Sequence, residues 1–100
     1  MIKHIVFWKI KDSYQGKNKE ELISEAKEML VNLKTLIPEI KKIEVGSNIS
    51  SSPAALDLAL YSEFATEEDL NLYRDHPEHQ KVAEYIKKIT LSGSVVDYQV

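Results

Sequence analysis

The sequence has no cysteine and only one arginine among its 100 residues. Without cysteine, disulfides, thiolate catalysis and cysteine-ligated metals are excluded. The single arginine stands against twelve scattered lysines, and no basic stripe with interleaved aromatic residues occurs, so nucleic-acid binding is not expected. No apolar run approaches the ~20 residues of a membrane span, and the first nine residues are too short and too charged for a signal peptide. We therefore expect a cytoplasmic domain with no membrane partner.

The residues that are present describe a globular chain. Hydrophobic residues make up 43% of the sequence, charged residues 29%, and the formal net charge is -3. A chain of this length can bury one core, and no linker, repeat or disordered segment interrupts it. We expect a single domain over residues 1–100.

Hydrophobic periodicity predicts four strands and three helices. Residues 2–10 alternate as a strand, residues 11–17 form a loop, and a three- and four-residue spacing from Leu22 predicts a helix that Pro38 stops. Strands are predicted over residues 43–46 and 56–64, followed by a short helix after Thr66. A further helix begins at Pro77 with His76 or Asp75 as its cap, and residues 94–100 form the last strand after Gly93.

The order β-α-β-β-α-α-β suits a ferredoxin-like α+β fold, in which helices cover one face of an antiparallel sheet. Ile5 and Phe7 fall on one face of the first strand, and Val6 and Trp8 fall on the other. Because the helices can cover only one face, the other would leave apolar side chains in water. A second copy stacked sheet to sheet, ~10 Å away, would cover them. We therefore expect a homodimer.

The segment from Tyr73 to His79 gathers groups that can move or orient protons near neutral pH. His79 shares the inward stripe of its helix, and Tyr73 follows Leu70 by three residues and should also point inward. His4 lies on the Val6 and Trp8 face of the first strand. If that face lies under the helices, the three side chains meet in one cavity, where an imidazole could act as a base and a phenol could donate to an oxyanion.

Each of these residues also has a purely structural interpretation. An inward tyrosine or histidine is often a packed core residue whose polar atom bonds the backbone. His76 before Pro77 could simply cap the helix. Arg74 and Asp75 are expected to face solvent. Metal binding through His76, His79 and Asp75 is conceivable, but His-x-x-His has no third committed ligand here, so no metal is expected.

Three segments together resemble stress-responsive A/B barrel (Dabb) domains. They are the opening Ile2–Ile10, the stretch from Asp69 to Gln80 with its Tyr-x-x-His-Pro-x-His run, and the ending Val95–Tyr98. The resemblance covers nearly the whole chain. It implies a dimeric α+β barrel.

The family includes a plant polyketide cyclase that closes its substrate by aldol condensation without a cofactor. By this resemblance Tyr73, His79 and His4 are candidate catalytic residues: His79 would abstract the proton next to a carbonyl, and Tyr73 would hold the carbonyl oxygen. The substrate-binding candidates are Trp8, His76 and Leu58. Leu58 replaces a pocket histidine of the cyclase, which implies a differently shaped pocket. No cofactor is implied.

Two functions remain open on the sequence. One is a dimeric domain of unassigned reaction that binds a small molecule between sheet and helices. The other is a cofactor-independent cyclase or lyase-like enzyme that performs acid–base chemistry on a carbonyl or polyketide-like substrate, with His79 as the base.

Overall fold

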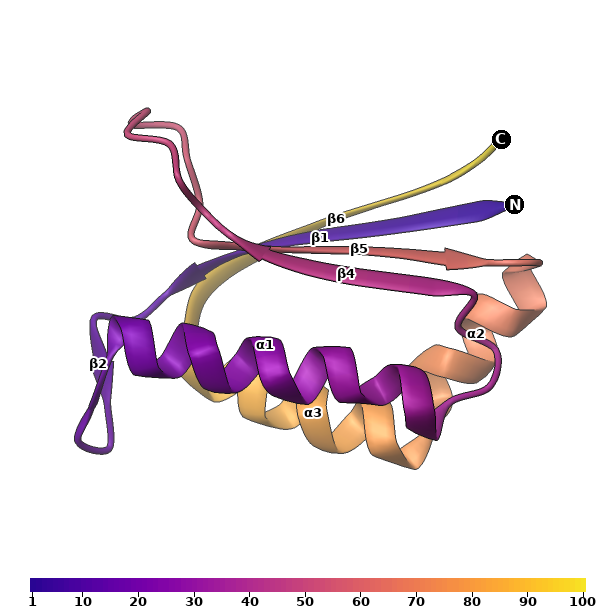
Figure 1. Cartoon of the computed structure of the whole chain (residues 1–100), viewed down its shortest axis with the longest axis horizontal. Helices are drawn as coiled ribbons and strands as arrows, with labels where there is room; N and C mark the ends of the chain where they lie inside the picture. The colour runs from indigo at the N-terminus through magenta and orange to yellow at the C-terminus, as the bar shows by residue number, and fades with distance from the viewer.

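A computed structural model describes residues 1–100 as two layers, with a sheet on one side and helices on the other (Figure 1). The four-stranded antiparallel sheet has the order β4-β5-β1-β6. The predicted α+β architecture is confirmed. The elements are β1 (Ile2–Ile10), β2 (Ser13–Tyr14), β3 (Lys17–Asn18), α1 (Lys19–Leu36), β4 (Lys42–Ser47), β5 (Leu58–Phe64), α2 (Glu67–Asp75), α3 (Pro77–Ile89) and β6 (Thr90–Gln99).

Local capping explains where the helices begin. Asn18 and Glu21 form a reciprocal capping box at the start of α1, and the Thr66 hydroxyl accepts from the Asp69 amide at the start of α2. His76 is the N-cap of α3, and Pro77 occupies its first turn, where a missing N–H has no cost. The sharp junction between α2 and α3 is therefore built into the sequence. None of the helices is both long and apolar enough to span a bilayer.

Several boundaries differ from the sequence-based expectation, among them those of β4, which spans Lys42–Ser47, and of β5, which begins at Leu58 rather than at residue 56. The 11–17 segment is not a plain loop, because β2 and β3 form a small hairpin whose turn places Gln15 and Gly16 at positive φ. The last strand begins at Thr90 rather than at Ser94, and Gly93 pairs with Trp8 inside it. A Cβ on Gly93 would lie 3.1 Å from Trp8 Cδ1, so glycine here serves the close approach of the indole rather than a turn.

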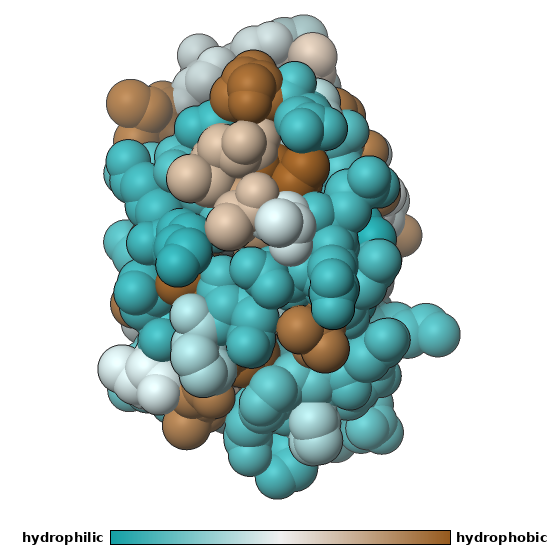
Figure 2. Space-filling view, turned by 90° about the vertical axis from the view of Figure 1, so that its right-hand side faces the viewer, coloured by the Kyte–Doolittle hydropathy of each residue, from teal (hydrophilic) through white to brown (hydrophobic).

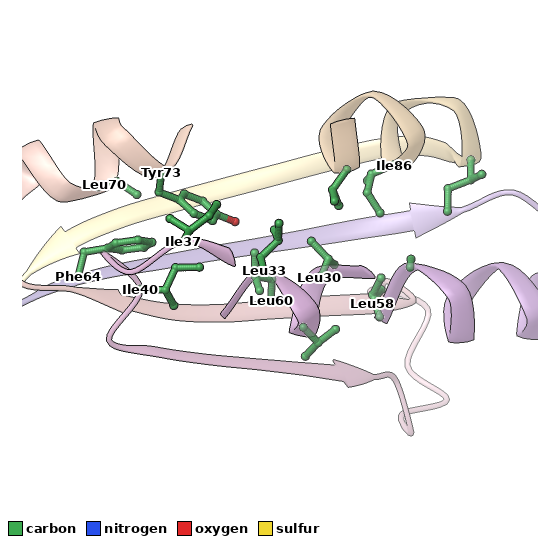
Figure 3. Close-up of a cluster of buried hydrophobic side chains, with 14 of the residues drawn as sticks. Leu30, Leu33, Ile37, Ile40, Leu58, Leu60, Phe64, Leu70, Tyr73 and Ile86 are labelled. Atoms are coloured by element: carbon green, nitrogen blue, oxygen red, sulfur yellow. The ribbon is translucent and has the colours of Figure 1, made fainter. Parts of the chain in front are cut away.

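The core lies between the sheet and the helices (Figure 3). From the sheet, Leu58, Leu60 and Phe64 are at most 2% exposed, and from α1, Leu33 is fully buried. Strand β1 presents Ile2, His4, Val6, Trp8 and Ile10 to this layer, as its alternation predicted.

The opposite sheet face carries exposed apolar side chains. Phe7 is 40% exposed, Val96 54% and Tyr98 44%, and their register places them on the same face as Ile5. Figure 2 views the end of the molecule with α2 and both termini, where the surface is mainly hydrophilic and apolar side chains gather near the top, on the sheet side. The uncovered sheet face is the apolar surface that the alternation of β1 predicted.

Candidate functional site

A cavity of about 390 Å³ lies between the sheet and α3, where β1 and β6 meet the helix. Its walls are mostly apolar, with Val6 and Leu60 from the sheet and Val82 and Ile86 from α3. Cavities of this size and character are the usual sites of small ligands, in which a few polar groups fix the orientation of an apolar body. The polar side chains in this wall are His4, Tyr73, His79, Lys87, Thr90 and Ser92.

Tyr73 lines this cavity from α2 and has no exposed surface. Figure 3 shows its side chain reaching from α2 into the space between helices and sheet, beside Phe64. Its hydroxyl is the one buried side-chain N or O atom in the chain without a hydrogen-bond partner. Burial raises the pKa of Tyr73 to about 12, so the phenol keeps its proton at neutral pH. An unpaired buried hydroxyl normally costs stability, so this one is a candidate donor to a ligand.

His79 stands beside Tyr73, with ring centroids 4.3 Å apart. Its Nδ1 lies 3.0 Å from the Arg74 carbonyl oxygen. Because a carbonyl can only accept, Nδ1 carries the proton, and Nε2 is left as the acceptor. Burial is the largest cause of a lowered pKa for His79, and the Arg74 carbonyl only partly opposes it. His79 is therefore neutral at pH 7 and has a free basic nitrogen.

His4 reaches the cavity from β1, with its ring centroid 5.9 Å from that of Tyr73. Its Nδ1 lies 2.5 Å from a carboxylate oxygen of Asp97, its direct partner across the β1–β6 ladder. The carboxylate accepts from Nδ1–H and so fixes the orientation of the ring. Arg74 pairs with the other oxygen of Asp97. The histidine is held by a carboxylate that is itself held by a guanidinium.

The structure brings four of the six candidate residues together: His4, Trp8, Tyr73 and His79 all line the cavity. His76 does not line it, because its Nδ1 accepts from the Glu78 amide at 3.1 Å as a helix cap. Leu58 does not line it either.

Leu58 is the first residue of β5, opposite Trp8 in the sheet, and it packs in the apolar core with 2% of its surface exposed.

Other residues of the site were missed from the sequence. Asp97 was not singled out, and its pairing with Arg74 behind His4 was not expected, although the Arg74 side chain does face solvent and is 42% exposed. The spacing along β6 could not reveal Asp97, because its role comes from the register with β1. His76, His79 and Asp75 do not converge, and no group of three or more acidic or histidine side chains is placed to hold a metal ion.

The arrangement can perform one elementary step. A neutral imidazole with a free Nε2 and a protonated phenol share an apolar cavity, where the low dielectric strengthens both hydrogen bonding and charge stabilisation. Such a pair can remove a proton from a carbon acid while stabilising the negative charge that develops on an adjacent oxygen.

Solved structures share this fold over the whole chain. A dimeric protein of unknown function with a ferredoxin-like fold from Bacteroides fragilis is 35% identical, covering 99% of this chain and 95% of its own, with a TM-score of 0.84. A hydroxynitrile lyase from Passiflora edulis is 20% identical over 99% of this chain and 92% of its own, with a TM-score of 0.85.

A Dabb family protein from Mesorhizobium loti is 22% identical over 99% of this chain and 95% of its own, with a TM-score of 0.75. The similarities to the hydroxynitrile lyase and to the Mesorhizobium loti protein, at 20% and 22% identity, show the fold alone. No curated protein matches the sequence. Residues 2–100 match the family model of the stress responsive A/B barrel domain, so the chain belongs to the Dabb family.

Proposed function

We propose that the cavity binds a small carbonyl compound and transfers a proton at the carbon next to the carbonyl. His79 Nε2 takes the proton, the C–H electron pair moves into the carbonyl, and the Tyr73 hydroxyl donates to the oxygen that gains the charge. Return of a proton from Nε2 to the carbon restores the compound. The observation that carries the proposal is the buried Tyr73 hydroxyl, which has no partner in the chain and stands beside a neutral histidine.

The same step opens several reactions. A carbanion held in this way can close a ring or, in reverse, take part in carbon–carbon cleavage, which is the cyclase or lyase-like alternative. The hydroxynitrile lyase from Passiflora edulis has this fold. His4 completes the constellation: with Nδ1–H held by Asp97, its Nε2 is left to hydrogen-bond a ligand beside Tyr73.

Binding without turnover is the second candidate function. Most of the cavity wall is apolar, with nine hydrophobic residues among the fifteen that line it. The relative from Bacteroides fragilis is described as a dimeric protein of unknown function. In this case Tyr73 would orient a ligand through a hydrogen bond and no proton would be exchanged.

The chain is also proposed to act as a homodimer. The relative from Bacteroides fragilis is dimeric, and the exposed Phe7, Val96 and Tyr98 make the uncovered sheet face the surface on which a second copy would stack. Each subunit would then keep its own cavity on the opposite, helix-covered side of the sheet.

Proton exchange separates the two candidate functions. Methyl heptyl ketone in deuterated buffer is a suitable probe, because its α-protons exchange slowly by themselves near neutral pH and are resolved by NMR. The acid–base proposal predicts catalysed loss of these proton signals by the unaltered protein. Binding of the ketone without faster exchange would contradict it and favour the binding function.

The pH dependence of that exchange is a second expectation. Because the pKa of His79 is lowered from 6.5, the imidazole is protonated, and lost as a base, only below that pH. The exchange rate should therefore fall only as the pH drops beneath 6.5. Because the pKa of Tyr73 is about 12, the rate should stay level through pH 10. A half-maximal rate above pH 7, or a fall near pH 10, would contradict these assignments. The measurement is the initial exchange rate from pH 5 to pH 10.5.

A further inference from the structure

The cavity has a second polar end, away from Tyr73. Lys87 contributes to it from the last turn of α3, Thr90 and Ser92 from the start of β6, and Trp8 from β1. Their side chains supply an ammonium, two hydroxyls and an indole N–H. None of these four donor groups is bonded within the protein. The ion pairs of the chain involve other lysines, namely Lys3, Lys9, Lys17, Lys19 and Lys81.

No carboxylate lines the cavity. Asp97 stands behind His4, where it is occupied by the imidazole and by Arg74. The wall therefore offers hydrogen-bond donors and one full positive charge at this second end, without an acid to neutralise them. A group with anionic oxygens is the chemical complement of such a set.

The distance between the two polar ends can be estimated independently from α3 and from β1. Along α3, His79 and Lys87 are eight residues apart, which is ~12 Å at the rise of a helix. Along β1, His4 and Trp8 are four residues apart, which is ~13 Å at the rise of a strand. Between them the wall is apolar, with Val82 and Ile86 on the helix.

We propose that the ligand of this cavity is an elongated oxo acid, with its carbonyl at Tyr73 and His79, an apolar chain along α3, and an anionic group at Lys87. This inference rests on the proposed function, because that function places the carbonyl end. It adds the substrate class: the anion binds at the mouth and determines which end of the molecule enters first. Lys87 is exposed and acts on binding, whereas the reacting atoms lie at the buried end.

The test compares methyl heptyl ketone with the keto acid that carries a carboxylate in place of its terminal methyl group. Calorimetry gives the Kd of each for the unaltered protein, Lys87→Ala and Lys88→Ala. Lys88 is the matched control, because it adjoins Lys87 in the last turn of α3 and carries the same charge but does not line the cavity. Both substitutions remove a cation from the helix C-terminus, so dipole effects cancel in the comparison.

Lys87→Ala is expected to raise the Kd of the keto acid about five- to tenfold, the range of a partly exposed charge-assisted contact. The Kd of the ketone should change by less than about twofold, and Lys88→Ala should alter neither by more. If exchange is catalysed, KM for the keto acid should rise with kcat unchanged, because the anion contact is the same in ground and transition states. Added salt should weaken the binding of the keto acid but not the binding of the ketone.

The outcomes are distinguishable from those of the proposed function. Catalysed exchange of the ketone together with equal keto-acid affinity in all three proteins would overturn the oxo-acid assignment and leave the proton-transfer proposal standing. A loss of keto-acid affinity confined to Lys87→Ala, without exchange of either compound, would support the ligand class and overturn proton transfer. Equal losses in the two lysine variants would overturn the assignment as a general charge effect.

Discussion

The His79→Ala variant is expected to keep its fold and to lose catalysed exchange of ketone α-protons by about 10²- to 10⁴-fold, the usual contribution of a positioned base. His79 is half-buried at the cavity wall, and its one hydrogen bond within the chain is Nδ1–H to the Arg74 carbonyl. The Gln80 side-chain amide donates to the same carbonyl at 2.7 Å, so that acceptor stays satisfied when the imidazole is removed. The measurement is the exchange rate of methyl heptyl ketone together with thermal unfolding.

Gln80→Ala is the matched control. It removes the other donor to the Arg74 carbonyl, from the next position of α3, but Gln80 is exposed and does not line the cavity. Its exchange rate should therefore stay close to that of the unaltered protein. If His79→Ala exchanged protons at the unaltered rate, His79 would not be the base. If Gln80→Ala lost as much activity as His79→Ala, the effect would come from the α2–α3 junction.

Phe7→Asp is expected to convert the dimer into a monomer at micromolar concentration. The side chain points out of the uncovered sheet face, and stacking of a second copy would bury it. A carboxylate enclosed there without a partner costs several kcal/mol, so the dimer Kd should rise more than about 100-fold. Sedimentation should then change from twice the 11.5 kDa chain mass to the chain mass itself.

Val31→Asp provides the comparison. Val31 is 43% exposed against 40% for Phe7, but it lies on α1 rather than on the sheet. The same charge introduced there should leave the dimer intact, because stacked sheets do not contact that helix surface. An unaltered protein that sediments as a monomer would refute the stacking proposal. Dissociation by Val31→Asp but not by Phe7→Asp would place the interface on the helical layer instead.

The sequence predicted most of the fold, because most local signals agreed with the packing. The alternation of β1 correctly placed His4 and Trp8 under the helices, and Pro77 with the preceding His76 marked the start of α3. The early start of β6 was missed because Gly93 reads as a turn residue. It is instead a strand residue that leaves room for the Trp8 indole.

The site was predicted in part. Tyr73, His79 and His4 could be grouped, because helix and strand periodicity show which side chains point inward. Asp97 could not be found in this way, since only the β1–β6 register places it opposite His4. Arg74 looked like a surface residue by its own spacing, and its pairing with Asp97 depends on how α2 lies at the end of the sheet. Contacts between distant segments carry no periodic signal.

The stability of Tyr73→Phe is the most direct test of the claim that the Tyr73 hydroxyl is kept for a ligand. With no partner in the chain, the hydroxyl contributes nothing to folding and leaves a desolvation cost. Denaturant unfolding of the ligand-free protein should therefore show the variant to be as stable as the unaltered protein, or more stable, by up to about 1–3 kcal/mol. Exchange of methyl heptyl ketone should fall at the same time by about 10²- to 10³-fold, as for loss of an oxyanion donor. A variant that is destabilised by a similar amount while still exchanging protons would show that the hydroxyl is a bonded packing group, and would contradict the account.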